Sequence, residues 1–121
     1  MDNVFRFESA EPGNSCRILA RTIDGTKAEA RVVPGIVNNT YILIVKGKKP
    51  YLNMSVRLSP LTYVRQPEYW GVEVLGCVSG ISLPTIGAYE EFLPLDGIRG
   101  TCGIEIIWAG GDTEKIDVPP K

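Results

Sequence analysis

Histidine is absent from the sequence. It is the side chain whose ordinary pKa lies closest to neutrality, and it supplies the base of Ser-His-Asp and Cys-His catalytic groups and many zinc ligands. Its absence excludes those catalytic arrangements and any imidazole metal site. We therefore expect no catalytic residues, no metal site and no cofactor, and a hydrolase that works without histidine is the least favoured function.

Cysteine is scarce, and Cys16, Cys77 and Cys102 are the whole set. Their odd number and wide spacing fit neither a disulfide framework nor a C-x-x-C zinc or redox motif. A free cysteine usually behaves as a small buried apolar side chain. The sequence therefore predicts three reduced, mostly buried thiols and a cytoplasmic location.

A strong net charge and long apolar runs are also missing. The 13 Lys and Arg residues nearly balance the 14 Asp and Glu residues, which gives a net charge of -1. Binding to nucleic acid or to an anionic membrane needs clustered basic side chains. No apolar run approaches the roughly 18 residues of a membrane span, and the first residues do not resemble a signal peptide. We expect a soluble protein with no nucleic-acid or membrane partner.

The dominant pattern in the chain is an alternation of apolar and polar residues with a period of two. A length of 121 residues with 44% apolar content suits one domain, 1–121, with a modest core. No linker, repeat or low-complexity segment divides the chain. The alternating segments predict strands over 4–8, 16–23, 27–32, 40–46, 51–58, 69–78, 88–95, 101–109 and 113–118.

Short strands at even spacing, joined mostly by tight turns, are typical of antiparallel sandwiches and barrels. We predict an all-β, single-domain antiparallel β-sandwich of eight or nine short strands, with a small closed or partly open β-barrel as the alternative. The pair Asp24-Gly25 predicts a hairpin, because its turn requires positive φ angles that glycine accepts. Pro94 favours an edge position for the strand over 88–95.

The segment 40–46 carries five consecutive apolar residues. A strand that is apolar on both faces is normally covered on both. We therefore expect a central strand whose outer face is covered by a loop or by a second copy of the chain, which makes a homo-oligomer the expected state. The predicted core consists of Ile18, Ala30, Val32, Leu43, Val45, Met54, Val56, Val72, Val74, Ile104, Ile106 and Trp108.

The connection 59–70 is the best candidate for a functional surface. Ser59-Pro60 resembles the start of a helix and Pro67 ends anything long, so we expect one or two helical turns or an ordered loop. Tyr, Trp and Arg contribute more than their share of binding energy at interfaces. The candidate binding residues are Tyr63, Arg65, Gln66, Tyr69 and Trp70.

Two weaker candidates for chemistry are also present. Glu90 and Glu91 are adjacent in a predicted strand, so their side chains point to opposite faces and an acid–base pair is disfavoured. Cys102 lies near Arg99 in a glycine-rich turn, where a cation can lower a thiol pKa. Without a histidine base, the favoured interpretation of Cys102 is a small side chain at the start of a strand.

The leading hypothesis is a non-catalytic binding module, not an enzyme. It contacts a protein partner through the connection 59–70 and self-associates through the apolar strand 40–46. The alternative is a small-ligand or carbohydrate-binding domain, β-barrel or lectin-like. A cavity of a few hundred Å³ lined by Tyr69 or Trp70 favours the small ligand, whereas a flat apolar patch favours a protein partner.

Overall fold

The computed structural model describes residues 4–5 and 14–119, and these residues form β-strands joined by turns. A single short 3₁₀ turn, Ala109–Gly111, is the one helical element in this part of the chain. The strands are β1 Val4–Phe5, β2 Asn14–Ile18, β3 Thr22–Ile23, β4 Thr26–Lys27, β5 Glu29–Pro34, β6 Tyr41–Lys49, β7 Ser55–Pro60, β8 Thr62–Tyr63, β9 Tyr69–Ser79, β10 Gly87–Pro94, β11 Gly103–Ile107 and β12 Thr113–Asp117. The prediction of a strand over 4–8 is met at β1, and residues 6–8 lie outside the described part.

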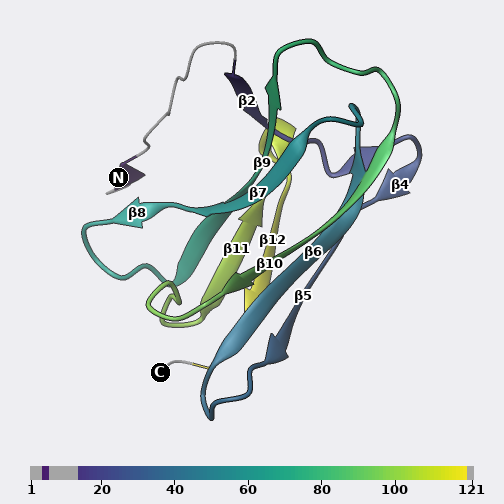
Figure 1. The fold of residues 1–121 in the computed structure, drawn as a ribbon. Coiled ribbons are helices and arrows are strands. Elements are labelled where there is room, and N and C mark those ends of the chain that lie inside the picture. Colours follow the sequence, from purple (N-terminus) through teal and green to yellow (C-terminus); the bar gives the residue numbers. More distant parts are fainter. Residues whose placement is uncertain (1–3, 6–13, 120–121) are drawn as a thin grey trace.

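Two sheets form the two layers of the fold (Figure 1). One sheet has the order β10-β6-β5, with β6 in the centre. The other is organised around the long strand β9, which pairs with β7 along one edge. Along its other edge β9 pairs first with β11 and then with β2, and β12 completes this sheet beside β11.

The prediction of an all-β sandwich is confirmed, and the described strands do not close into a barrel. One pairing departs from the predicted antiparallel arrangement, because β11 runs parallel to β9. The chain leaves β9, passes through β10 in the opposite sheet and returns beside β9 in the same direction. Such a crossover is the connection that a parallel pair requires.

Most of the predicted core is confirmed. Nine of the twelve predicted residues are buried: Leu43, Val45, Met54, Val56, Val72, Val74, Ile104, Ile106 and Trp108. Ala30 and Val32 are partly buried and pack against this core. The core also contains residues that were not predicted, among them Leu19, Ala28, Tyr89, Leu95 and Val118.

The prediction that Ile18 lies in the core is wrong. Ile18 is only half-buried, whereas its neighbour Leu19 is 2% exposed. The face of the strand that carries Leu19 points inward. It looks polar in the sequence because Arg21 lies on the same face. The Arg21 guanidinium lies over the buried ring of Trp108, 4.3 Å from its centroid. A long arginine side chain covers apolar surface in this way while its charged end reaches polar partners.

The predictions for the first hairpin and for the central strand are confirmed. Asp24 and Gly25 join β3 to β4 with φ angles of 53° and 71°. Strand β6 is paired on both sides, and Leu43 and Val45 point into the core. The predicted edge strand over 88–95 is β10, which pairs with β6 alone among the described strands.

The expectation of three reduced, buried thiols is wrong, because Cys16 and Cys77 form a disulfide. The two cysteines are 61 residues apart in the sequence but directly opposite each other in the β2–β9 pair. Opposite residues of antiparallel strands bring their Cβ atoms within about 5.5 Å. The remaining thiol, Cys102, is exposed. Since disulfides persist mainly in oxidising compartments, the basis for a cytoplasmic location is lost.

No helix with the length and hydrophobicity needed to cross a lipid bilayer occurs in residues 4–5 or 14–119.

Candidate functional site

The connection after β7 is extended rather than helical. Ser59 and Pro60 are the last residues of β7 and lie opposite β9, and Leu61 N donates to Gly71 O at 2.9 Å. The predicted helical turn is therefore wrong, and the alternative, an ordered loop, is observed in an extended form. Proline is tolerated at Pro60 because β7 is an edge strand among the described strands and needs no second ladder of hydrogen bonds.

A backbone clamp fixes the far end of the connection. Glu68 O accepts hydrogen bonds from Cys102 N at 2.7 Å and from Gly103 N at 3.1 Å, and Pro67 O accepts one from Thr101 N at 2.9 Å. The approach is so close that a Cβ atom on Gly100 would overlap the carbonyl of Glu68. The segments 63–70 and 97–103 are therefore held against each other by backbone contacts.

A cavity of about 340 Å³ lies between these two segments. Its lining residues are Tyr63, Val64, Arg65, Gln66, Trp70, Gly97, Arg99 and Thr101. Four of the five predicted binding residues are among them, and Tyr69 is not. Their role in binding stays a prediction, but the fold brings these four side chains to one hollow.

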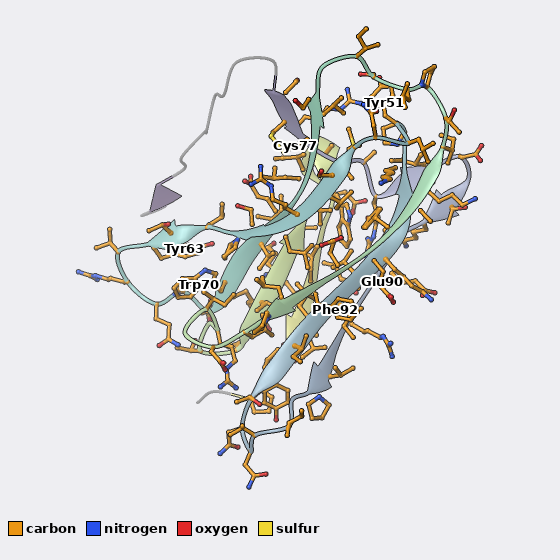
Figure 2. The ribbon with its side chains drawn as sticks, viewed as in Figure 1. Tyr51, Tyr63, Trp70, Cys77, Glu90 and Phe92 are labelled. Carbon is orange, nitrogen blue, oxygen red and sulfur yellow. A yellow bond between two sulfur atoms is a disulfide. The ribbon has the colours of Figure 1, made fainter. Side chains whose placement is uncertain are left out.

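The aromatic wall of the cavity is formed by Tyr63 and Trp70, which lie side by side in Figure 2. Their ring centroids are 5.1 Å apart in an edge-to-face arrangement. The Trp70 Nε1 donates to Leu61 O at 2.8 Å, and the Tyr63 hydroxyl accepts from Gly71 N at 3.0 Å. Because backbone groups bind these polar atoms, the rings are left to offer carbon surface to a ligand.

The polar wall of the cavity contains two arginines and no Asp or Glu side chain. Arg99 is 4% exposed, and its terminal nitrogens donate to Asn39 O and Pro119 O, both at 2.8 Å. Gln66 Nε2 donates to the Arg99 carbonyl at 2.9 Å. Arg65 is exposed and makes no ion pair with any residue that the structure describes. The cavity therefore carries an excess of positive charge.

Tyr69 points to the other side of β9 from Trp70, as alternate residues of a strand do. Its hydroxyl donates to Asp117 Oδ1 at 2.7 Å, and Lys115 lies 5.0 Å above its ring. The hydrogen bond to the Asp117 carboxylate raises the pKa of Tyr69 to about 12. Tyr69 thus connects β9 to β12 across the surface of the sheet and does not contact the cavity.

Sequence reasoning did not find Val64, Gly97, Arg99 or Thr101 as lining residues. Val64 lies inside the predicted connection but carries no polar signal. The turn 97–101 is separated from the connection by all of β9 and β10, and no pattern indicated which turn would lie against 63–70. The close approach of Gly100 is the one feature that could have indicated it, since a buried backbone contact favours glycine.

The arrangement offers little for catalysis. The terminal nitrogens of Arg99 are bound to backbone carbonyls, while Cys102 is exposed and its Sγ lies 3.9 Å from Thr101 Oγ1. Glu90 is exposed and Glu91 half-buried on opposite faces of β10. In the described part of the chain, no three His, Cys, Asp or Glu side chains gather where they could hold a metal ion. That the protein is not an enzyme stays a prediction.

Comparison with protein-family models, curated proteins and solved structures finds no match to this chain.

A second surface lies on the outer face of the β10-β6-β5 sheet. Phe92, labelled in Figure 2, is 58% exposed. It lies opposite the outward-pointing Ile44 of β6, and Pro94 lies opposite Ile42 two positions further along the strand. Ile44 is buried beneath these neighbours within one chain, while Phe92 itself stays exposed on the outer face of the sheet. Self-association through this strand stays a prediction.

Proposed function

We propose that the protein is a non-catalytic binding module that holds a small ligand in the cavity between segments 63–70 and 97–101. The observation that supports this best is the cavity itself, a hollow of about 340 Å³ beside Trp70 and Tyr63. Small-molecule sites are typically concave, lined by aromatic carbon and provided with a few fixed polar groups. Such a hollow suits a small ligand better than the flat contact of a protein partner.

The rigidity of the cavity also favours ligand binding. The hydrogen bonds from residues 101–103 to Pro67 and Glu68 hold one end, and those of Trp70 and Tyr63 hold the other. A site whose walls are already ordered loses little conformational entropy when a ligand enters. Preorganisation of this kind lets a small hollow bind selectively.

Filling the cavity tests the proposal. Thr101 is exposed at the lining, so Thr101→Phe places a ring in the hollow without disturbing the core. We expect this variant to bind its best ligands at least about tenfold more weakly than the wild type. Saturation-transfer NMR against a panel of monosaccharides and ring-containing carboxylic acids measures the effect.

Thr113→Phe is the matched control, since Thr113 is equally exposed but lies on β12, away from the cavity lining. It should bind like the wild type. The proposal is contradicted if no member of the panel binds, or if Thr101→Phe and Thr113→Phe bind equally well.

Self-association through the outer face of β6 and β10 is a second candidate function, supported by the exposure of Phe92. Replacing Phe92 with serine removes the exposed ring from the outer face of the sheet. If the protein forms a dimer through this face, Phe92→Ser should weaken it by about tenfold or more, because an aromatic side chain at the centre of an interface often contributes over 2 kcal/mol. Light scattering over a concentration series measures the change, and a monomeric wild type would remove this candidate.

We also propose a cellular compartment for the protein, on the basis of its disulfide. A bond between Cys16 and Cys77 supports an oxidising, non-cytoplasmic compartment, where such bonds persist.

A further inference from the structure

We infer that the ligand of the cavity carries a carboxylate on a single ring, with the ring against Trp70 and the carboxylate bound by Arg65 and attracted by the buried charge of Arg99. This inference rests on the proposed function and names the chemical class of its ligand. It covers two sources of the same chemistry, an acidic monosaccharide and an aromatic acid, which the experiment below separates.

The charge of the cavity is the first argument. Arg65 and Arg99 both line it, and no Asp or Glu side chain does. Elsewhere in the described chain the partly buried Arg21 pairs with Asp112 and Glu114, whereas neither cavity arginine has such a partner among the described residues. An arginine that lines a cavity and has no carboxylate partner is suited to binding an anionic ligand.

The burial of Arg99 is the second argument. The residue as a whole is 4% exposed, its terminal nitrogens donate to two backbone carbonyls, and its buried Nε has no hydrogen-bond partner among the described residues. Tyr41 lies beneath the guanidinium, 5.3 Å away. No carboxylate among the described residues pairs with it, and a buried cation without a counter-charge is costly. A ligand carboxylate bound at Arg65 stabilises this charge from the adjacent cavity rather than by direct contact.

The aromatic wall and the volume define the rest of the ligand. Tyr63 and Trp70 offer ring carbon, because their polar atoms are bound to the backbone. A flat or chair-shaped ring packs well against such a surface, whereas a bare inorganic anion gains nothing from it. A volume of about 340 Å³ lies at the lower end of the range for ligand sites, so it fits one substituted ring and not a chain of several.

The remaining polar groups suit an oxygen-rich ligand. The Gln66 amide donates to the Arg99 carbonyl and so keeps its own carbonyl oxygen free to accept. Thr101 is exposed at the lining and its hydroxyl can donate or accept. Both groups can therefore bind hydroxyls on the ring while Arg65 binds the carboxylate.

Matched pairs of ligands test the inference by isothermal titration calorimetry on the full chain at low salt. Glucuronate is compared with glucose, benzoate with benzyl alcohol, and inorganic phosphate serves as the ring-free anion. We expect at least one carboxylate to bind about tenfold or more tightly than its neutral counterpart, because hydrogen bonds to charged groups are the strong ones. The preferred carboxylate identifies the source, an acidic sugar or an aromatic acid.

Arg65→Gln provides the matching protein variant. Arg65 is exposed and unpaired among the described residues, so its replacement should leave the fold intact. The variant should lose most of the preference for the carboxylate while still binding the neutral ring. Arg31→Gln removes the same charge from an exposed arginine on β5 and should behave like the wild type.

These measurements distinguish failure of the inference from failure of the proposed function. Equal binding of charged and neutral rings, unaffected by Arg65→Gln, overturns the inference and leaves the binding site in place. Phosphate binding as tightly as the preferred carboxylate overturns the role of the ring. If no ring compound of either charge binds, the proposed function itself is overturned.

Discussion

Replacing Cys16 and Cys77 together with alanine should lower the free energy of unfolding by about 4 kcal/mol. The disulfide joins residues separated by 61 positions, so it removes a large amount of loop-closure entropy from the unfolded chain. For a chain of this length that loss corresponds to a drop in melting temperature of roughly 15 °C. Thermal and urea unfolding of the variant and the wild type measure the difference, and adding a reductant to the wild type should reproduce it.

Cys102→Ser is the matched control for this effect. Cys102 is a free, exposed thiol, and its replacement should change the free energy of unfolding by less than about 0.5 kcal/mol. A melting temperature that is the same for the double variant, the Cys102→Ser variant and the reduced wild type would show that the two cysteines are not bonded in the folded protein.

Gly100→Ala should damage both the fold and the candidate site. The added Cβ meets the backbone of Pro67 and Glu68, which cannot rotate away as a side chain can. The two segments must then separate, and the hydrogen bonds of Thr101 and Cys102 to the connection weaken. We expect a loss of roughly 3 kcal/mol in stability from overpacking and broken hydrogen bonds. Ligand binding in the cavity should weaken by at least about tenfold.

Gly80→Ala separates this steric effect from a general cost of replacing glycine. Gly80 has a φ of +79° and open space around it, so alanine there costs about 1 kcal/mol from backbone strain alone. It lies in the turn after β9, outside the cavity lining, and should not alter binding. Urea unfolding measures the stability of both variants, and isothermal titration calorimetry measures their ligand binding. Equal effects of the two substitutions would contradict the close approach of the connection to Gly100.

Local patterns predicted the features of the fold that depend on neighbouring residues. Alternation of apolar residues located most of the strands, Asp24-Gly25 located a hairpin and the apolar segment 40–46 located a central strand. Each of these depends on side-chain spacing or on backbone angles within a few residues. The prediction of which residues point inward was wrong at Ile18 and Leu19. The local pattern places Arg21 in solvent, whereas its guanidinium packs over Trp108, a residue far away in the sequence.

Pairings between distant segments could not be predicted in this way. Nothing near Cys16 indicates that Cys77 lies opposite it, because that register is set by the whole β2–β9 pair. The parallel alignment of β11 with β9 likewise depends on how β10 crosses between the sheets.

The candidate site shows the same division between local and distant information. Sequence reasoning singled out Tyr63, Arg65, Gln66 and Trp70 because aromatic and arginine side chains cluster in one connection. It did not separate Tyr69 from this group, although strand alternation sends adjacent residues to opposite faces. Arg99 reaches the cavity through a turn that folds back from the far end of β10, and its buried charge is a property of tertiary structure.

The most direct test of the binding site is a map of backbone amide shifts in ¹H–¹⁵N NMR spectra during titration with glucuronate or benzoate. Binding in the cavity predicts that the shifts concentrate at 63–66, at Trp70 and at 97–101, and that they saturate together. Shifts that concentrate around Phe92, that scatter over the surface without saturating, or that do not occur with either ligand would contradict a binding site between these two segments.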